Sequence, residues 1–252
     1  MLRLRTLLVA MFGAAYVAFV GIPLIFYTFV AGDVTFFYNV TMKAFRAAFK
    51  IGGIRLRAFG LENIPPRACI FAANHVSNLD PTAIVAALPC RVSVLAKKQV
   101  LDVPIVGTAL RQANILAVDR SNRESAAGSV EKAIEYLRGG LSFLVFPEGT
   151  RSPDGRLQAF RKGTFLMAIR AGVLIVPVSV AGSQERMRRG EWLLRPGDIV
   201  LRFGAAVDAR QYHLDTKDEL IAEVRARVAA GLPPEQQPLL GGFAGAQQSA
   251  GN

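Results

Sequence analysis

The stretch CIFAANHVSNLDP, residues 69–81, decides how this chain folds. Five apolar residues, Cys69–Ala73, are followed at once by polar side chains and then by Asp80-Pro81. The apolar run is typical of a buried strand, and an aspartate followed by proline is typical of a helix start. A buried strand that leads through a polar turn into a helix indicates one unit of an α/β fold.

The chain on either side repeats this alternation of strand and helix. Further strands are predicted at Val92–Ala96, Ile115–Val118, Ser142–Phe146, Leu174–Val180 and Ile199–Phe203. Helices are predicted at Thr82–Leu88, about Pro104–Gln112, Glu124–Arg138, Phe160–Arg170 and Lys217–Ala230. This order predicts an α/β domain over residues 53–231, with a mixed, largely parallel sheet flanked by helices. Residues 232–252, rich in Pro, Gly and Gln, are predicted to be a disordered tail.

Residues 1–52 predict a hydrophobic helical membrane anchor. Thr6–Gly32 contains no charged residue, and Arg3 and Arg5 precede it. As one helix this segment would measure about 40 Å, more than the hydrocarbon core of about 30 Å. We expect Gly21-Ile22-Pro23 to bend or break that helix near its middle.

The next segment, Val34–Lys50, predicts an amphipathic helix. Its apolar stripe is Met42, Phe45 and Phe49, and its basic stripe is Lys43, Arg46 and Lys50. Apolar residues flanked by cations suit an interfacial helix on anionic lipid. The alternative is an ordinary amphipathic helix that packs on the domain.

Composition narrows the classes of function. The chain has 252 residues and a formal net charge of +11, which implies an anionic partner: nucleic acid, an acidic membrane surface or a phosphorylated substrate. Its two cysteines form no CxxC or Cys/His cluster, so no metal site is predicted. Nucleotide-binding glycine motifs and the Gly-x-Ser-x-Gly nucleophile motif are absent.

His75 and Asp80 form the first candidate site, in the turn between strand and helix. Across such a turn the carboxylate can approach the imidazole, and a histidine oriented by an aspartate can remove a proton from a hydroxyl group. A structural histidine held by an aspartate would have the same spacing. The other histidine, His213, lies in a polar segment and is predicted to be a surface residue.

A second candidate site, FPEGTRS at residues 146–152, follows another apolar strand. Its Pro and Gly predict a turn with exposed N–H groups, and Arg151 suits phosphate oxygens. A surface turn with a solvated Glu–Arg pair is the alternative. Arg120 follows a further predicted strand. It would be either a second phosphate ligand or the ion-pair partner of Asp119. Residues 175–180 are almost wholly apolar, which fits a core strand or an acyl-chain wall.

Taken in order, NHVSNLD (74–80), NILAVDR (114–120), FPEGTRS (146–152) and IVPVSV (175–180) resemble the four motif blocks of the glycerolipid acyltransferases. The chain is most similar to the branch of bacterial 1-acyl-sn-glycerol-3-phosphate acyltransferases. The resemblance covers about residues 73–180.

The resemblance implies a role for each matching residue. His75 would be the general base and Asp80 would orient it. Glu148, Gly149, Thr150 and Arg151 would form the acceptor site, Arg120 and Arg151 would bind the acceptor's phosphate, and Lys97 or Lys98 would add positive charge there.

The implied reaction transfers a fatty acyl group from acyl-CoA or acyl carrier protein to the 2-hydroxyl of 1-acyl-glycerol-3-phosphate (lysophosphatidic acid), without cofactor or metal. Membrane lipids are the expected partners and nucleic acid is not. We expect a two-segment monotopic or re-entrant anchor in the bacterial inner membrane, with the catalytic domain on the cytoplasmic face; the alternative is a true membrane span. The alternatives are another acceptor, such as lyso-ornithine lipid or glycerol-3-phosphate, a hydrolase that releases free fatty acid, and a noncatalytic protein that binds anionic lipid.

Overall fold

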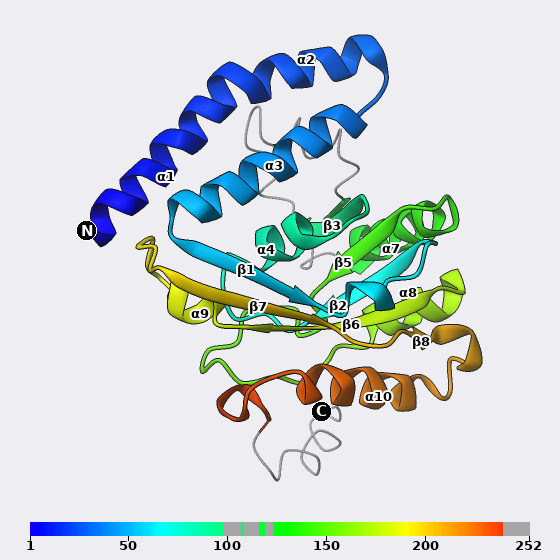
Figure 1. Cartoon of the computed structure of the whole chain (residues 1–252). Coiled ribbons are helices and arrows are strands. Elements are labelled where there is room, and N and C mark those ends of the chain that lie inside the picture. Colours follow the sequence, from blue (N-terminus) through cyan, green and yellow to red (C-terminus); the bar gives the residue numbers. More distant parts are fainter. Residues whose placement is uncertain (98–106, 108–115, 119–122, 239–252) are drawn as a thin grey trace.

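The structure is a computed structural model that describes residues 1–97, 107, 116–118 and 123–238 (Figure 1). Of residues 95–97, 117, 118 and 123–127 it describes the backbone alone. The predicted helix at Pro104–Gln112 therefore lies almost wholly outside the described residues, as do Lys98 and Arg120.

A mixed sheet forms the centre of the domain, as predicted. In the part of the chain that the structure describes, its strand order is β1-β7-β6-β2-β5-β3-β4, and β8 also pairs with β6. Among the described strands, only the β6–β7 and β6–β8 pairs are antiparallel. The strands are β1 (Ile54–Phe59), β2 (Cys69–Ala73), β3 (Val92–Lys97), β4 (Leu116–Val118), β5 (Ser142–Val145), β6 (Leu174–Ala181), β7 (Gly197–Phe203) and β8 (Val207–Asp208).

Helices cover both faces of this sheet, because the central strands are apolar on both sides. In β2, Phe71 packs into a core with helices α3 and α4, whereas Ile70 packs into a second core with α7, α8 and α10. The helices are α3 (Thr35–Ile51), α4 (Asp80–Ala87), α7 (Arg123–Arg138), α8 (Gly163–Ala171), the short α9 (Ser183–Arg186) and α10 (Lys217–Ala230). Short 3-10 turns occupy Leu61–Asn63, Ala209–Gln211 and Pro234–Gln236.

The amino-terminal segment is one continuous helix from Leu2 to Ala31, so the chain does not break at Gly21-Ile22-Pro23, and the helix bends there instead (Figure 1). Helices α1 (Leu2–Tyr16) and α2 (Ile22–Ala31) are joined by a π-helical turn, Val17–Gly21. In this wider turn Ile22 N–H donates to the carbonyl five residues back, which accommodates a proline that lacks an N–H. The helix is long and apolar enough to cross a membrane and is mostly uncovered by protein, which indicates membrane association.

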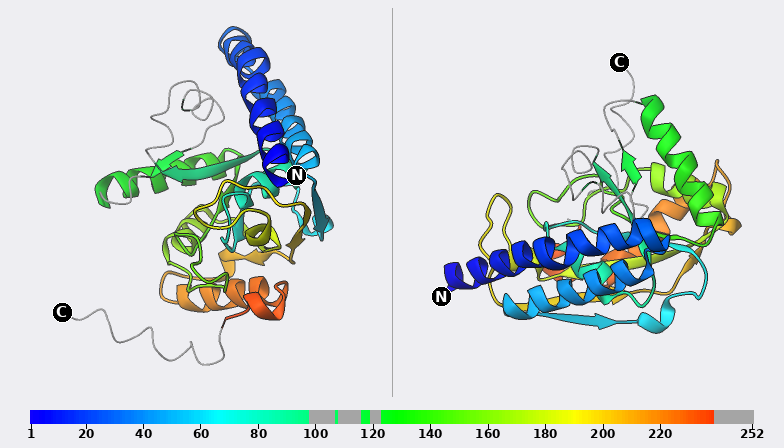
Figure 2. Two further views of the ribbon diagram at one scale, coloured as in Figure 1. Left: turned by 90° about the vertical axis from the view of Figure 1, so that its left-hand side faces the viewer. Right: turned by 90° about the horizontal axis from the view of Figure 1, so that it is seen from above.

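The predicted apolar stripe of α3 packs on the domain, which favours the alternative of an ordinary amphipathic helix. Met42 and Phe49 are buried in the core shared with α4 and the sheet. Arg46 Nε donates to the Ala86 carbonyl over 2.6 Å. Helix α1 runs beside α3, where Tyr16 and Thr41 share a hydrogen bond, and the α2–α3 turn projects away from the domain (Figure 2).

The carboxyl-terminal segment is ordered beyond the predicted boundary at residue 231. Leu232 and Gln236 are buried, and the Gln236 carbonyl accepts the Leu157 N–H. This hydrogen bond ties the segment to the loop that follows β5. Residues 239–252 of the predicted tail lie outside the described residues.

Candidate active site

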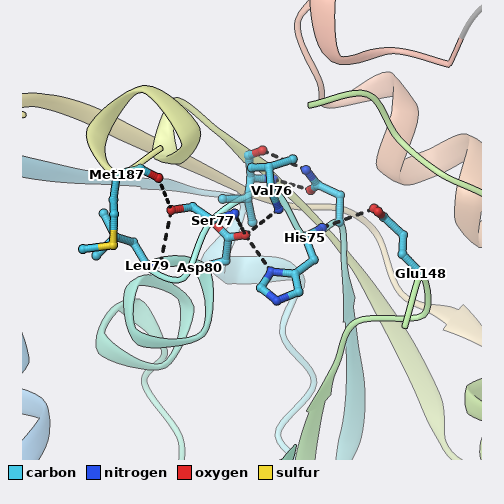
Figure 3. A network of polar contacts seen from close by, with 9 residues as sticks. His75, Val76, Ser77, Leu79, Asp80, Glu148 and Met187 are labelled. Carbon is cyan, nitrogen blue, oxygen red and sulfur yellow. Dashed lines mark hydrogen bonds and ion pairs between the residues drawn. The ribbon is translucent and has the colours of Figure 1, made fainter. Parts of the chain in front are cut away.

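Two turns at the carboxyl ends of the neighbouring parallel strands β2 and β5 form the candidate site (Figure 3). The first turn carries His75 and leads into α4, and the second contains Glu148. In open α/β sheets this edge is where ligands bind. The two sequence blocks, about seventy residues apart in the chain, are therefore brought together by the pairing of β2 with β5.

His75 and Asp80 are in direct contact, as predicted. His75 Nδ1 lies 2.9 Å from Asp80 Oδ2, and the imidazole is 18% exposed whereas the carboxylate is wholly buried. An ionised carboxylate can only accept hydrogen bonds, so Nδ1 carries the proton and donates it to Asp80. This leaves a lone pair on Nε2, the ring nitrogen that can take a proton from a substrate hydroxyl.

Asp80 is itself fixed by the backbone of the turn. The N–H groups of Val76 and Ser77 each donate to Asp80 Oδ2 over 2.7 Å. Asp80 also begins α4, where a negative charge interacts favourably with the helix dipole. Three donors on one buried oxygen therefore hold the carboxylate in place against His75.

Side chains on either side of His75 attach the turn to the rest of the domain. The Asn74 amide group donates to the Val180 carbonyl over 3.0 Å and accepts from its N–H over 2.7 Å, which joins the end of β2 to β6. Ser77 Oγ donates to the Met187 carbonyl over 3.0 Å. Both side chains are buried, so the turn has little freedom to move.

Glu148 points inward to the backbone of His75, which differs from its expected place in the acceptor site. Its Oε1 accepts the His75 N–H over 3.2 Å, and the residue is 4% exposed (Figure 3). Burial raises the pKa of this carboxyl to about 8, against the opposing effect of the His75 and Gln158 N–H groups and Arg225. Glu148 therefore supports the backbone of the His75 turn from the protein interior.

The second turn also contacts His75 directly. The Ser152 N–H donates to the His75 carbonyl over 2.7 Å. The Phe146 ring stacks on the imidazole, with 4.2 Å between ring centroids and 26° between planes. The backbone and the ring of His75 are thus both positioned by the β5 turn, and its Nδ1 by Asp80.

The structure describes the other predicted site residues to different extents. Gly149 turns the chain at φ 78°, Thr150 is exposed and Arg151 is half-buried. Within the described ranges the Thr150 and Arg151 side chains have no hydrogen-bond or ion-pair partner. Lys97 is described by its backbone alone, at the end of β3.

Arg161 is a further cation at this site, from the stretch Phe160–Gly163, which also resembles the family pattern but to which the sequence assigned no role. Its Nε lies 2.7 Å from where a Cβ on Gly149 would be, and the Arg161 N–H donates to the Pro147 carbonyl. The side chain is exposed and has no carboxylate partner in the described part of the chain. Its position depends on the path of the chain after the FPEGTRS turn, and no local pattern reports that path.

Two other predictions can be compared with the structure. His213 is exposed, as predicted. Residues 175–180 lie in β6, buried between the two helical layers, which favours the interpretation as a core strand. Among the described residues, no three His, Cys, Asp or Glu side chains cluster as metal ligands would.

The chain was compared with known proteins. Residues 55–181 match the family model described as Acyltransferase. The 1-acyl-sn-glycerol-3-phosphate acyltransferase of Limnanthes douglasii is 32% identical over 190 residues, 75% of this chain and 67% of the relative. The enzyme of the same name from Borreliella burgdorferi is 36% identical over 140 residues, 54% of this chain and 56% of the relative. The matches thus span about two thirds or less of these relatives.

The fold is also that of a solved structure. The crystal structure of the 1-acyl-sn-glycerophosphate (LPA) acyltransferase PlsC from Thermotoga maritima superposes with a TM-score of 0.77 at 29% identity. The superposition covers 90% of this chain and 94% of the PlsC chain, so it extends beyond the catalytic domain into most of the remaining chain. From the family match, the similar relatives and the shared fold, we conclude that this chain belongs to the acyltransferase family.

Proposed function

We propose that this enzyme transfers a fatty acyl group from acyl-CoA or acyl carrier protein to the 2-hydroxyl of 1-acyl-glycerol-3-phosphate, which yields phosphatidic acid. The observation that carries the proposal is the His75–Asp80 pair, which leaves Nε2 as a base at the carboxyl edge of the sheet. The names of the relatives and of the PlsC structure support this acceptor and this reaction.

In the proposed mechanism His75 Nε2 takes the proton from the 2-hydroxyl while that oxygen attacks the thioester carbonyl. The tetrahedral intermediate then collapses and the carbon–sulfur bond breaks. His75 returns its proton to the departing thiolate, and Asp80 stabilises the imidazolium that exists between the two transfers. A thioester is already activated, so positioning and a single base suffice.

Cations near the second turn are proposed to bind the acceptor's phosphate. Arg161 lies beside Gly149, Arg151 follows it two residues later, and neither arginine has a carboxylate partner in the described part of the chain. A guanidinium group can bind two phosphate oxygens at once. We propose Arg120 and one of Lys97 or Lys98 as additional ligands. Glu148 acts in this scheme as a positioning residue for His75.

The proposed place of action is the cytoplasmic face of the bacterial inner membrane. The acceptor and product are amphiphiles of the bilayer, whereas both acyl donors are cytosolic. The apolar helix Leu2–Ala31 would hold the domain at the membrane, and the surplus of cations would attract anionic lipid. Membrane lipids, the lysophosphatidate acceptor and the two acyl donors are the proposed partners.

The test is an acyl-transfer assay on the full chain in mild detergent, with labelled acyl-CoA or acyl carrier protein. His75→Ala is compared with His213→Ala, which removes the other, exposed histidine. We expect labelled phosphatidate from the parent and from His213→Ala, and a rate lower by about 10²- to 10⁴-fold from His75→Ala. An equal thermal midpoint for the two variants shows that the loss is not one of folding.

Parallel reactions distinguish the alternatives. Product from lyso-ornithine lipid or glycerol-3-phosphate alone would keep the mechanism and replace the acceptor. Free fatty acid without an acceptor would indicate a hydrolase. Lipid binding without transfer, unchanged in His75→Ala, would indicate a noncatalytic protein and refute the proposal.

A further inference from the structure

The loop between α9 and β7, residues 187–196, has an exposed tip and a buried base. At the tip, Trp192 is 79% exposed, and Arg188 and Arg189 are exposed with no carboxylate partner among the residues described. At the base, Met187 and Leu194 are buried. Trp192 is the only tryptophan in the sequence. A single exposed aromatic residue is ordinary on protein surfaces, so its surroundings decide what it does.

Hydrogen bonds fix the base of this loop to two other parts of the protein. The Leu194 N–H donates to Thr6 Oγ over 3.0 Å, in the first turn of the apolar helix. The Met187 carbonyl accepts from Ser77 Oγ, in the turn that carries His75. The loop therefore connects the start of the anchor with the histidine turn, and Figure 2 shows it beside the amino-terminal end of α1.

The end of the anchor beside this loop is rich in cations. Arg5, Arg46 and Lys50 line a cavity of about 910 Å³ together with Pro196 from the loop, and none has a carboxylate partner in the described ranges. Beyond them Thr6–Gly32 has no charge, and Leu7, Leu8 and Met11 are exposed. The surface of the anchor thus changes from cationic to apolar close to the 187–196 loop.

We propose that the 187–196 loop is a second membrane-binding element: Trp192 enters the bilayer interface while Arg188 and Arg189 bind anionic headgroups. Tryptophan favours this layer because its ring is apolar and its N–H is polar. Arginines next to an anionic bilayer are attracted to it. Since the loop base is bonded to Ser77, contact of the tip with the headgroups sets the height of the His75 turn above the bilayer. This inference does not depend on which acceptor the enzyme uses.

Because Trp192 is the only tryptophan, its fluorescence tests the proposal directly in the full chain. The protein is reconstituted into vesicles of phosphatidylethanolamine and phosphatidylglycerol that carry bromine near the glycerol end or near the methyl end of the acyl chains. We expect stronger quenching by bromine near the glycerol end, and weak quenching by acrylamide from the water. Strong acrylamide quenching with no bromine quenching would overturn the proposal.

The matched control is the Trp192→Phe, Leu214→Trp double variant. Leu214 is 56% exposed and follows β8, which pairs with the amino-terminal end of β6, opposite the site edge. In this variant the tryptophan at position 214 should be quenched by acrylamide and not by bromine, even though the variant has the same anchor helix as the parent. Arg188→Gln, Arg189→Gln tests the role of charge: bromine quenching of Trp192 should fall in anionic vesicles. Unchanged quenching in that variant would refute the part of the proposal that concerns anionic headgroups.

Discussion

Glu148→Gln tests the inference that a buried carboxyl supports the His75 turn. Glu148 is 4% exposed, and burial raises its pKa to about 8 from an ordinary value of 4.5. Between these two pH values the folded protein keeps a proton that the unfolded chain releases. The stability contributed by this group is therefore fully present below pH 4.5 and is lost progressively as the pH rises to about 8.

The magnitude follows from the width of that pH interval. About 3.5 pH units, at about 1.4 kcal/mol for each unit, correspond to a loss on the order of 5 kcal/mol in the free energy of unfolding. Glutamine has nearly the same shape and does not titrate. Its carbonyl oxygen can still accept the His75 N–H, so the variant keeps the contact and is free of the pH-dependent cost.

The assay is urea unfolding of the detergent-solubilised parent and Glu148→Gln, followed by circular dichroism from pH 5 to 9. The variant should gain stability over the parent as the pH rises, with the difference levelling off above about pH 8. Glu62→Gln, at an exposed carboxyl, should follow the parent at every pH. Parallel pH profiles for Glu148→Gln and the parent would refute the reasoning, because they would mean that Glu148 is ionised in the folded protein.

Three further substitutions test the site. Asp80→Asn should lower kcat by about 10²- to 10⁴-fold with little change in KM, because a neutral amide with its oxygen in the place of Oδ2 does not stabilise the imidazolium that forms when His75 takes the substrate proton; steady-state kinetics measure this, and retained kcat would contradict it. Asn74→Ala removes both hydrogen bonds to Val180 and should destabilise the fold by about 2–4 kcal/mol in urea unfolding, whereas a cost near zero would show that water replaces the amide. Gly149→Ala places a Cβ 2.7 Å from Arg161 Nε at a positive φ and should cost about 1–2 kcal/mol; an unchanged unfolding midpoint would mean that the turn relaxes without strain.

The sequence predicted the central strands and the His75–Asp80 contact because both have local causes. Cys69–Ala73 is apolar at every position, as expected of a strand that is buried on both faces. Asp80 contacts His75, which lies only five residues earlier in the chain. Strand β1 was not predicted, although Arg55 and Arg57 alternate with its apolar residues in the pattern of a half-buried strand. Both arginines pair with Asp198 on the neighbouring strand β7, a contact that no local pattern indicates.

Helix α3 shows a different limit of sequence reasoning. The stripe of Met42, Phe45 and Phe49 was read correctly as apolar, but an apolar stripe does not say whether lipid or protein covers it. The structure places the domain against Met42 and Phe49, and leaves the uncovered apolar surface to α1 and α2. Similarly, nothing in FPEGTRS indicates whether Glu148 faces the acceptor or the interior, because that depends on how β2 and β5 are aligned.

The inward direction of Glu148 changes what the second sequence block does in this fold. Read as a sequence, FPEGTRS is a substrate-binding turn, and Arg151 can still serve that purpose. In the structure, its Phe146 ring, Glu148 carboxyl group and Ser152 N–H all contact His75. The catalytic base is therefore positioned by two turns. In the first turn, Asp80 sets the tautomer of His75; the second turn fixes the imidazole ring and the backbone of His75. A change in FPEGTRS can thus lower kcat by displacing His75, even where it touches no substrate.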